Sequence, residues 1–245
     1  MKHPLHQASF EGDRTALQTR VFSDTIILGV EVPRKPTDKV TGAAARVSFL
    51  LSACRIMQTR LFLAGLPVRG AIDLGEYVLD EKTSAGQPII NEHDLADDLA
   101  FVGCVLTPAA HDYLFRLAQN KFGGTSTFAD YIDRFCTAYL VPRKTSKPAR
   151  LTTVDYLLRP RHEEDIRQLV LRAFWSYGRD ISEREQSKVI NTEQYLRFLQ
   201  ETDYLMKEGR EKPPGGLKSF GEVIGDTEQP TANDVVRTEQ TVKAE

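Results

Sequence analysis

The chain has 245 residues, 41% hydrophobic and 27% charged, which is enough for one substantial core with a smaller appendage. With 32 basic and 34 acidic side chains, its net charge of −2 gives no electrostatic reason to bind nucleic acid or an anionic membrane. Three separated cysteines among apolar neighbours favour reduced thiols and a cytoplasmic location over a disulfide framework, and no stretch reaches the roughly 18 apolar residues that span a bilayer.

The N-terminal part is predicted to be a polar arm followed by a hairpin. Residues 1–17 are polar, and the two histidines within them have no carboxylate or thiol at metal-ligand spacing. The density of β-branched residues then rises, and Ser23 with Asp24 forms the only polar break. This pattern predicts two strands with a turn near Asp24. Two prolines in residues 33–38 exclude a helix and predict a surface connection.

A long helix and a strand are predicted next. Val40 to Leu66 shows helical periodicity with apolar residues on two faces. We expect one face to lie on a sheet, and the other to meet another helix or a second subunit, or to be buried under the C-terminal helices. Val68–Leu79 is predicted to be a strand in which Gly70 and Gly75 allow backbone or ligand to approach closely.

The middle of the chain alternates helical and extended signals. Asn91 is predicted to cap an acidic helix, on which His93 and Asp97 are interpreted as solvated side chains rather than metal ligands. Residues 101–106 are predicted to be a strand, and Pro108 to open a helix.

The C-terminal part begins with a linker and ends in a tail. Gly123–Thr127 lacks the lysine and the preceding strand of a phosphate-binding loop, so it is predicted to be a connection. Asn191 and Thr192 are predicted to cap the last helix. Residues 208–245 are predicted to be a disordered tail because they contain few aromatic residues. Two strands and two amphipathic helices are predicted in between, at 138–143, 151–158, 163–178 and 191–207.

These elements predict one domain of the α+β class over residues 18–207. We expect a mixed, mainly antiparallel sheet with the long helix on one face and the C-terminal helices completing the core. Residues 20–30 and 68–79 are predicted to share that sheet.

Several motifs resemble those of the class III nucleotide cyclases, most closely the divergent bacterial branch of Pycsar-type pyrimidine cyclases in anti-phage defence. They are Phe22-Ser-Asp24-Thr-Ile-Ile, then Arg69-Gly-Ala-Ile-Asp-Leu-Gly75-Glu-Tyr, then Gly86-Gln-Pro-Ile-Ile. Tyr139-Leu-Val-Pro142 and Lys188-Val-Ile-Asn-Thr192 resemble the C-terminal extension of that branch. The resemblance covers roughly residues 18–200 and implies a ferredoxin-like, cyclase-type sheet with helices on one face.

The resemblance also implies a chemistry. In the family, two aspartates on neighbouring strands hold two Mg²⁺ or Mn²⁺ ions, and the ribose 3′-hydroxyl attacks the α-phosphate of a nucleoside triphosphate with release of pyrophosphate. Asp24 matches the metal aspartate of the hairpin, and Ser23, Arg69 and Asp73 are the matching nucleotide-binding candidates. The family's other metal aspartate lies on a first strand upstream of the hairpin, and residues 1–17 are not predicted to form such a strand. Cyclase sites form between two domains, so we expect a homodimer.

Two functions follow from this resemblance. One is a cyclase that forms a cyclic nucleotide when the missing metal ligand is supplied; the other is a non-catalytic, dimeric or nucleotide-sensing relative. A third interpretation is that Asp24 only forms a turn. Phosphate oxygens can complete the shell of an ion held by one carboxylate, so we expect metal-dependent triphosphate binding with little or no turnover. If turnover occurs, Asp73 is the first candidate for the missing ligand.

Overall fold

The computed structural model describes residues 17–32, 40–79, 83–119, 128, 132, 135–156, 166–175 and 182–207. The predicted arm (except Leu17), the predicted linker at 123–127 and the tail at 208–245 lie outside these residues. Within the described ranges, no helix combines the length and the apolar character that crossing a membrane requires.

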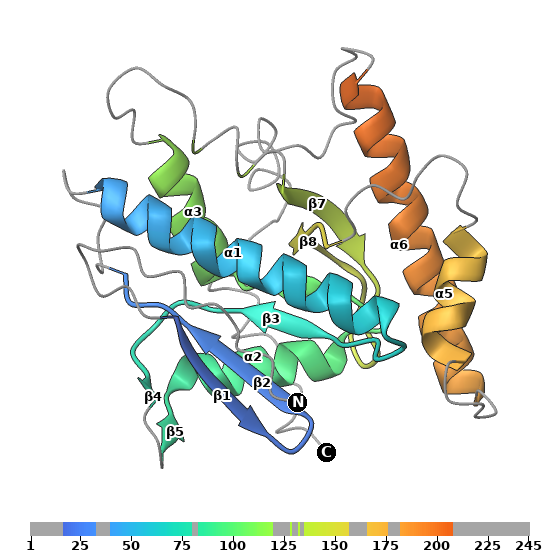
Figure 1. Ribbon diagram of the computed structural model, residues 1–245, viewed down its shortest axis with the longest axis horizontal. Coiled ribbons are helices and arrows are strands. Elements are labelled where there is room, and N and C mark those ends of the chain that lie inside the picture. The colour runs from blue at the N-terminus through green and yellow to red at the C-terminus, as the bar shows by residue number, and fades with distance from the viewer. Residues whose placement is uncertain are drawn as a thin grey trace, which may run out of the picture.

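The described elements form an α+β fold around one mixed sheet (Figure 1). In chain order they are β1 (Gln18–Phe22), β2 (Thr25–Gly29), α1 (Val40–Leu63), β3 (Gly70–Ile72), β4 (Val78–Leu79), β5 (Ser84–Ala85), α2 (Gln87–Asp98), β6 (Cys104–Leu106), α3 (Pro108–Gln119), β7 (Cys136–Val141), β8 (Ala149–Val154), α5 (Ile166–Trp175) and α6 (Glu183–Lys207). The main sheet has the order β3-β6-β8-β7, with β3 parallel to β6 and the other pairs antiparallel. The mixed, mainly antiparallel sheet is therefore confirmed.

The prediction that the hairpin shares a sheet with residues 68–79 is wrong. β1 and β2 pair only with each other, in a separate two-stranded sheet, and no described strand joins β2 to β3. The predicted strand at 68–79 is also divided into β3 and β4. Between these two strands, Gly75 packs on Pro88 at the start of α2, where an added Cβ would lie 2.6 Å from the proline Cγ.

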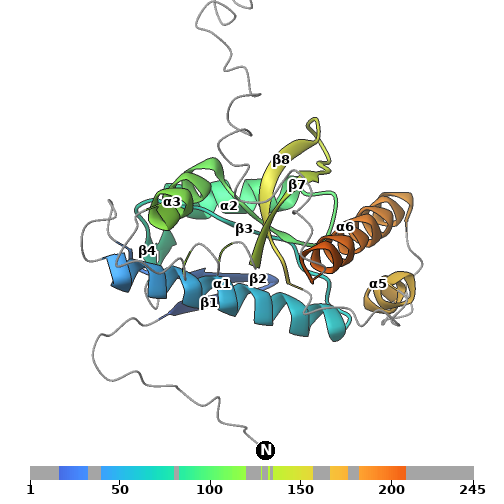
Figure 2. The ribbon, with the colours of Figure 1, turned by 90° about the horizontal axis from the view of Figure 1, so that it is seen from above.

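Helices cover both faces of the main sheet rather than one. Cys104 and Leu106 of β6 pack in a core with the first half of α1 and with α3. Val105, which alternation turns to the opposite face, packs in a second core with α5 and α6. Figure 2 shows α5 and α6 together at one end of the molecule. The C-terminal helices therefore complete the core, as predicted.

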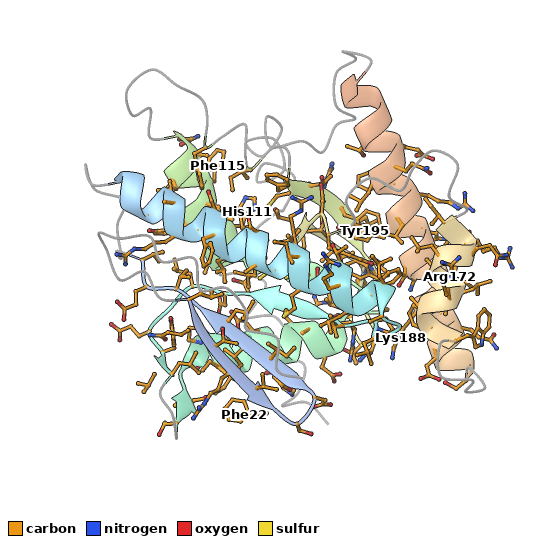
Figure 3. The ribbon with its side chains drawn as sticks, viewed as in Figure 1. Phe22, His111, Phe115, Arg172, Lys188 and Tyr195 are labelled. Atoms are coloured by element: carbon orange, nitrogen blue, oxygen red, sulfur yellow. The ribbon has the colours of Figure 1, made fainter. Side chains whose placement is uncertain are left out.

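Aromatic rings hold α6 on the sheet. Tyr195 points from α6 toward the sheet (Figure 3) and is fully buried. Its ring centroid lies 5.0 Å from that of Phe101 and 5.0 Å from that of Tyr139, and its hydroxyl donates to the Val154 carbonyl at 3.4 Å. Ring contacts of this kind stabilise by about 0.5–1.5 kcal/mol beyond the area that they bury.

The two predicted helix caps are wrong. α2 begins at Gln87 with Pro88 in its first turn, so Asn91 lies one turn inside it. α6 begins at Glu183 after a capping box, in which Ser182 Oγ accepts from the Glu185 amide and Glu185 Oε2 accepts from the Ser182 amide. The Ser-x-x-Glu spacing was the signal for this start.

The outer face of α1 carries exposed apolar side chains. Phe49, Ile56 and Leu63 are 54%, 58% and 56% exposed, so the described C-terminal helices do not cover them. The three residues are seven apart and lie along one side of the helix. Of the two expectations for this face, burial under the C-terminal helices is therefore wrong.

Thr192 provides a test of how α6 is fastened to the sheet. This fully buried residue donates to the Lys188 carbonyl and accepts from the Val102 amide at 2.9 Å. We expect Thr192→Val to lower the free energy of unfolding by about 1–3 kcal/mol, because the buried Val102 amide loses its acceptor. Denaturant unfolding measures this change.

Thr202 is the matched control on the same helix. It is 5% exposed and its hydroxyl bonds only the Phe198 carbonyl of its own helix. Thr202→Val leaves no backbone amide without an acceptor, so it should lower the free energy of unfolding by less than about 0.5 kcal/mol. Equal losses in the two variants would contradict the role given to Thr192.

Candidate functional site

A large cleft separates the hairpin from the main sheet. It is lined by β2, by one side of α1, by the segment from Pro67 to Leu79 and by α2, and we call it the hairpin cleft. Its volume is about 1780 Å³. Three of the predicted site residues line it, namely Asp24, Arg69 and Asp73.

The turn at Ser23 and Asp24 lies where the sequence predicted it. Phe22 pairs with Thr25 across a two-residue loop. Ser23 has a φ of 49°, in the left-handed region that favours glycine. Both turn residues are exposed, and the Asp24 carboxylate accepts one long hydrogen bond, 3.5 Å, from Thr25 Oγ1. Asp24 is thus an open carboxylate at the rim of the hairpin cleft.

Asp73, by contrast, is a junction between three elements. One carboxylate oxygen accepts from Asn91 Nδ2 of α2 at 2.8 Å, and the other accepts from Thr107 Oγ1 at the start of α3. The Asp73 amide donates to Glu92 Oε1 at 2.8 Å. These bonds hold the end of β3 against α2 and α3.

Glu92 is a partly buried carboxyl in the wall of the hairpin cleft. Burial raises its pKa to about 7; the hydrogen bond from the Asp73 amide opposes this shift, and the negative charge of Asp73 adds to it. Glu92 is therefore partly protonated near neutral pH. It sits next to Asp73, and the sequence analysis did not identify it.

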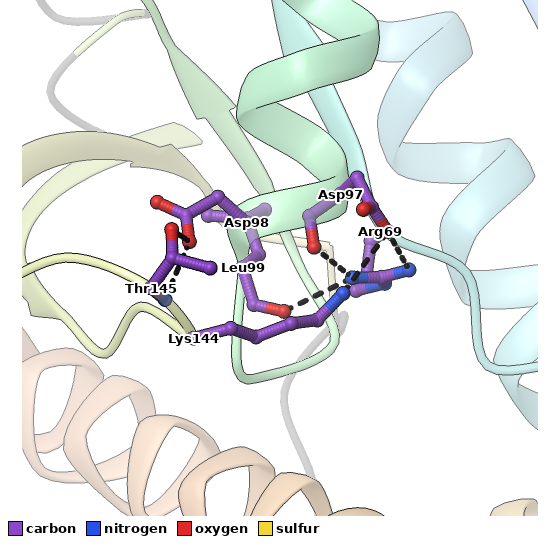
Figure 4. Close-up of polar contacts among 6 residues, drawn as sticks. All are labelled: Arg69, Asp97, Asp98, Leu99, Lys144 and Thr145. Carbon is purple, nitrogen blue, oxygen red and sulfur yellow. Dashed lines mark hydrogen bonds and ion pairs between the residues drawn. The ribbon is translucent and has the colours of Figure 1, made fainter.

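The side chain of Arg69 makes structural contacts at the C-terminal end of α2 (Figure 4). Its guanidinium donates to the Asp97 and Leu99 carbonyls at 2.7 and 3.1 Å and pairs with the Asp97 carboxylate at 3.2 Å. Lys144, from the turn between β7 and β8, reaches the same carboxylate at 3.0 Å. Hydrogen bonds from Lys144 and Arg69 lower the pKa of Asp97. Arg69 therefore fixes α2 to β3, and Asp97 is not a metal partner of the exposed His93.

The neighbouring Asp98 fastens the turn between β7 and β8. It accepts from the Thr145 amide at 2.8 Å and from the hydroxyls of Thr145 and Ser146 at 2.6 Å each. It also pairs with Arg143 at 2.7 Å. Although desolvation acts to raise the pKa of Asp98, these hydrogen bonds and the Arg143 charge hold it well below its ordinary value.

The interior of the hairpin cleft has polar atoms without partners. Gln58 of α1 is only 3% exposed, and its side-chain oxygen accepts no hydrogen bond. The hydroxyls of Tyr77 and Ser84 and the side-chain oxygen of Gln18 also line the cleft and have no hydrogen-bond partner. Buried polar atoms in native proteins are nearly always hydrogen-bonded, so water or a polar ligand in the cleft would supply the partners of these four atoms.

The lining of the hairpin cleft is strongly acidic. Among the described residues that line it, the charged side chains are one arginine, Arg69, against six carboxyl groups; the six are Asp24, Glu31, Asp73, Glu76, Glu92 and Asp97. Even so, nowhere in the described ranges do three His, Cys, Asp or Glu side chains gather closely enough to hold a metal ion. The three cysteines form no disulfide and are buried, as predicted.

Comparison with known proteins adds no family to this description. No protein-family model, curated protein or solved structure matches the chain.

The raised pKa of Glu92 predicts a pH-dependent stability. The pKa of Glu92 is 4.5 in the unfolded chain and about 7 in the folded protein, so the folded protein holds its proton more tightly. The free energy of unfolding should therefore decrease as the pH rises from about 4.5 to about 7, and should level off at higher pH. Glu92→Gln keeps a carbonyl acceptor for the Asp73 amide and removes the ionisation. We expect it to flatten this decline and to stabilise the protein by about 2–3 kcal/mol at about pH 8.

Denaturant unfolding across this pH range is the measurement. Asp94→Asn, at an exposed position on the same helix, is the control that removes one negative charge without relieving burial. An unchanged pH profile in Glu92→Gln would show that Glu92 is not the titrating group.

Proposed function

We propose that this chain is a nucleotide cyclase-like protein that binds a nucleoside triphosphate in the hairpin cleft, with Mg²⁺ or Mn²⁺ recruited at Asp24. The observation that carries the proposal is spatial. The motifs that resemble the cyclase family come from the hairpin and from the β3 region, and their residues Asp24, Arg69 and Asp73 line one cleft. Asp24 is the one of these three whose side chain the structure leaves open.

The charge of the cleft makes binding depend on a divalent ion. Six carboxyl groups against one arginine repel a bare triphosphate, and Arg69 is already paired with Asp97. A hard cation between Asp24 and the phosphate oxygens reverses this repulsion, since such ions need only one or two protein carboxylates when phosphates complete the shell. Binding in the absence of metal should therefore be negligible.

The described residues fit one such ion and do not fit a two-metal centre. Both Asp73 oxygens already accept hydrogen bonds from Asn91 and Thr107. Asp24 lies on an exposed turn, and it belongs to no group of three or more His, Cys, Asp or Glu side chains among the described residues that could hold a metal ion. We therefore propose binding with little or no turnover, which favours the nucleotide-sensing alternative over an active cyclase for this chain.

Calorimetry with ATP, GTP, CTP and UTP in the presence of Mn²⁺ tests the proposal. We expect wild type to bind at least one nucleotide and Asp24→Ala to bind it about tenfold or more weakly, because the ion loses its protein anchor. A parallel assay for cyclic nucleotide should detect little or no product.

Asp112→Ala is the matched control, since Asp112 is an exposed acid on α3 that does not line the hairpin cleft. It should bind like wild type. Equal affinity in wild type and Asp24→Ala, or no binding in either, would reduce Asp24 to a turn former. Robust cyclic nucleotide production would instead show that a second carboxylate completes the site.

We also propose that the protein is a two-fold homodimer, in which the outer face of α1 meets the same face of a second copy. The supporting observation is the row of half-exposed Phe49, Ile56 and Leu63, whose seven-residue spacing suits contact along another helix. A self-complementary patch of this kind is what a two-fold interface requires.

Sedimentation equilibrium of Ile56→Lys checks this assembly. We expect the charged side chain to shift the protein to a monomer without unfolding it, because Ile56 is 58% exposed. Ile190→Lys is the control, at a position on α6 that is 55% exposed. A monomeric wild type at high micromolar concentration would contradict the proposal.

A further inference from the structure

The hairpin cleft is bordered by two strand edges that pair with no described strand. β2 pairs with β1 along one edge only, and β3 pairs with β6 along one edge only. In β3, the Gly70 amide donates to the Gly103 carbonyl and the Ile72 carbonyl accepts from the Thr107 amide, both at 2.9 Å. Backbone groups alternate along a strand, so those of Ala71 point to the other edge.

The cleft is larger than one small ligand needs. Its volume of about 1780 Å³ exceeds the 300–1,000 Å³ of ordinary ligand pockets. The buried Gln58 oxygen without a partner also lies in its lining, next to β3, where the Gln58 amide nitrogen is 4.0 Å from a Cβ placed on Gly70. The unsatisfied groups are thus of the kind that backbone amides satisfy.

The two sides of the cleft differ in character. Ile72 and Leu74 pack in the core that includes α1, and α1 adds Leu50, Cys54, Met57 and Leu61 to the lining. The opposite side carries Asp73, which is hydrogen-bonded to the neutral side chains of Asn91 and Thr107 and keeps its charge. From α2 it also carries the partly protonated Glu92, and Asp97, which is already paired with Arg69 and Lys144. A chain lying between β2 and β3 would therefore meet an apolar wall on one side and, on the other, a polar wall that holds the charge of Asp73.

We infer that the hairpin cleft receives an extended segment of a partner polypeptide, which adds as a β-strand between β2 and β3. Alternate side chains of this segment are apolar toward α1 and basic toward α2. Backbone hydrogen bonds to both free edges supply the affinity, and the two walls select the alternating pattern. The inference is independent of nucleotide binding, because the strand edges do not depend on Asp24.

The experiment uses fluorescence anisotropy of a labelled Lys-Val-Lys-Val-Lys-Val-Lys peptide, without nucleotide or metal. Val21 and Ile26 lie opposite each other in the hairpin. They are a non-bonded pair, since Phe22 and Thr25 close the turn, so each amide points out of the hairpin. Only Ile26 borders the cleft. We expect Ile26→Pro to weaken binding about tenfold or more and Val21→Pro to leave it unchanged.

Two further arms decide the remaining outcomes. A peptide with proline in place of the central valine keeps the charge and should not bind; equal binding of both peptides would overturn strand addition. Ala71→Pro removes an edge amide from β3 without touching the hairpin, and binding that survives it would overturn the inference whatever the hairpin variants do. If the peptide does not bind, and the protein self-associates in a way that Ile26→Pro abolishes and Val21→Pro does not, then the occupant of the cleft is a second copy of the chain. That result would overturn the partner proposed here.

Discussion

The carboxylate of Asp73 joins the elements that form one wall of the hairpin cleft. It binds the side chains of Asn91 and Thr107, so the end of β3, the first half of α2 and the start of α3 meet at one residue. Asn91 and Glu92 follow each other in α2, and Glu92 accepts from the Asp73 amide, where partial burial raises the pKa of its carboxyl. Asp73, which the motif comparison suggested as a nucleotide-binding residue, therefore has a structural role: it connects β3, α2 and α3.

This structural role explains how the site differs from what the motifs suggest. Arg69, Asp73 and Asp24 line the same cleft, yet the side chains of Arg69 and Asp73 are hydrogen-bonded to residues at the ends of α2 and α3. Only Asp24 remains open to a ligand. The acidic lining is the reason why the nucleotide binding that we propose depends on a divalent cation.

The sequence predicted the elements that local patterns control. Helical periodicity located α1, and alternation with a polar turn located β7 and β8. The observed starts of α2 and α6 precede the predicted caps Asn91 and Asn191, because Pro88 occupies the first turn of α2 and the Ser182–Glu185 capping box starts α6. Glu92 was missed because its burial depends on Asp73, 19 residues away in the chain. Pairing between strands is likewise non-local, and this is why the separation of the hairpin from β3 could not be foreseen.

The fastening of α2 has a mechanical consequence. Pro88 packs on Gly75 at one end of this helix, Asn91 binds Asp73, and Asp97 and Asp98 are tied to β3 and to the turn after β7 at the other. The hairpin shares no strand pairing with that frame. These contacts hold α2 and β3 together as one fixed wall of the cleft. A change in the width of the cleft is therefore a displacement of the hairpin, and Asp24 moves with it.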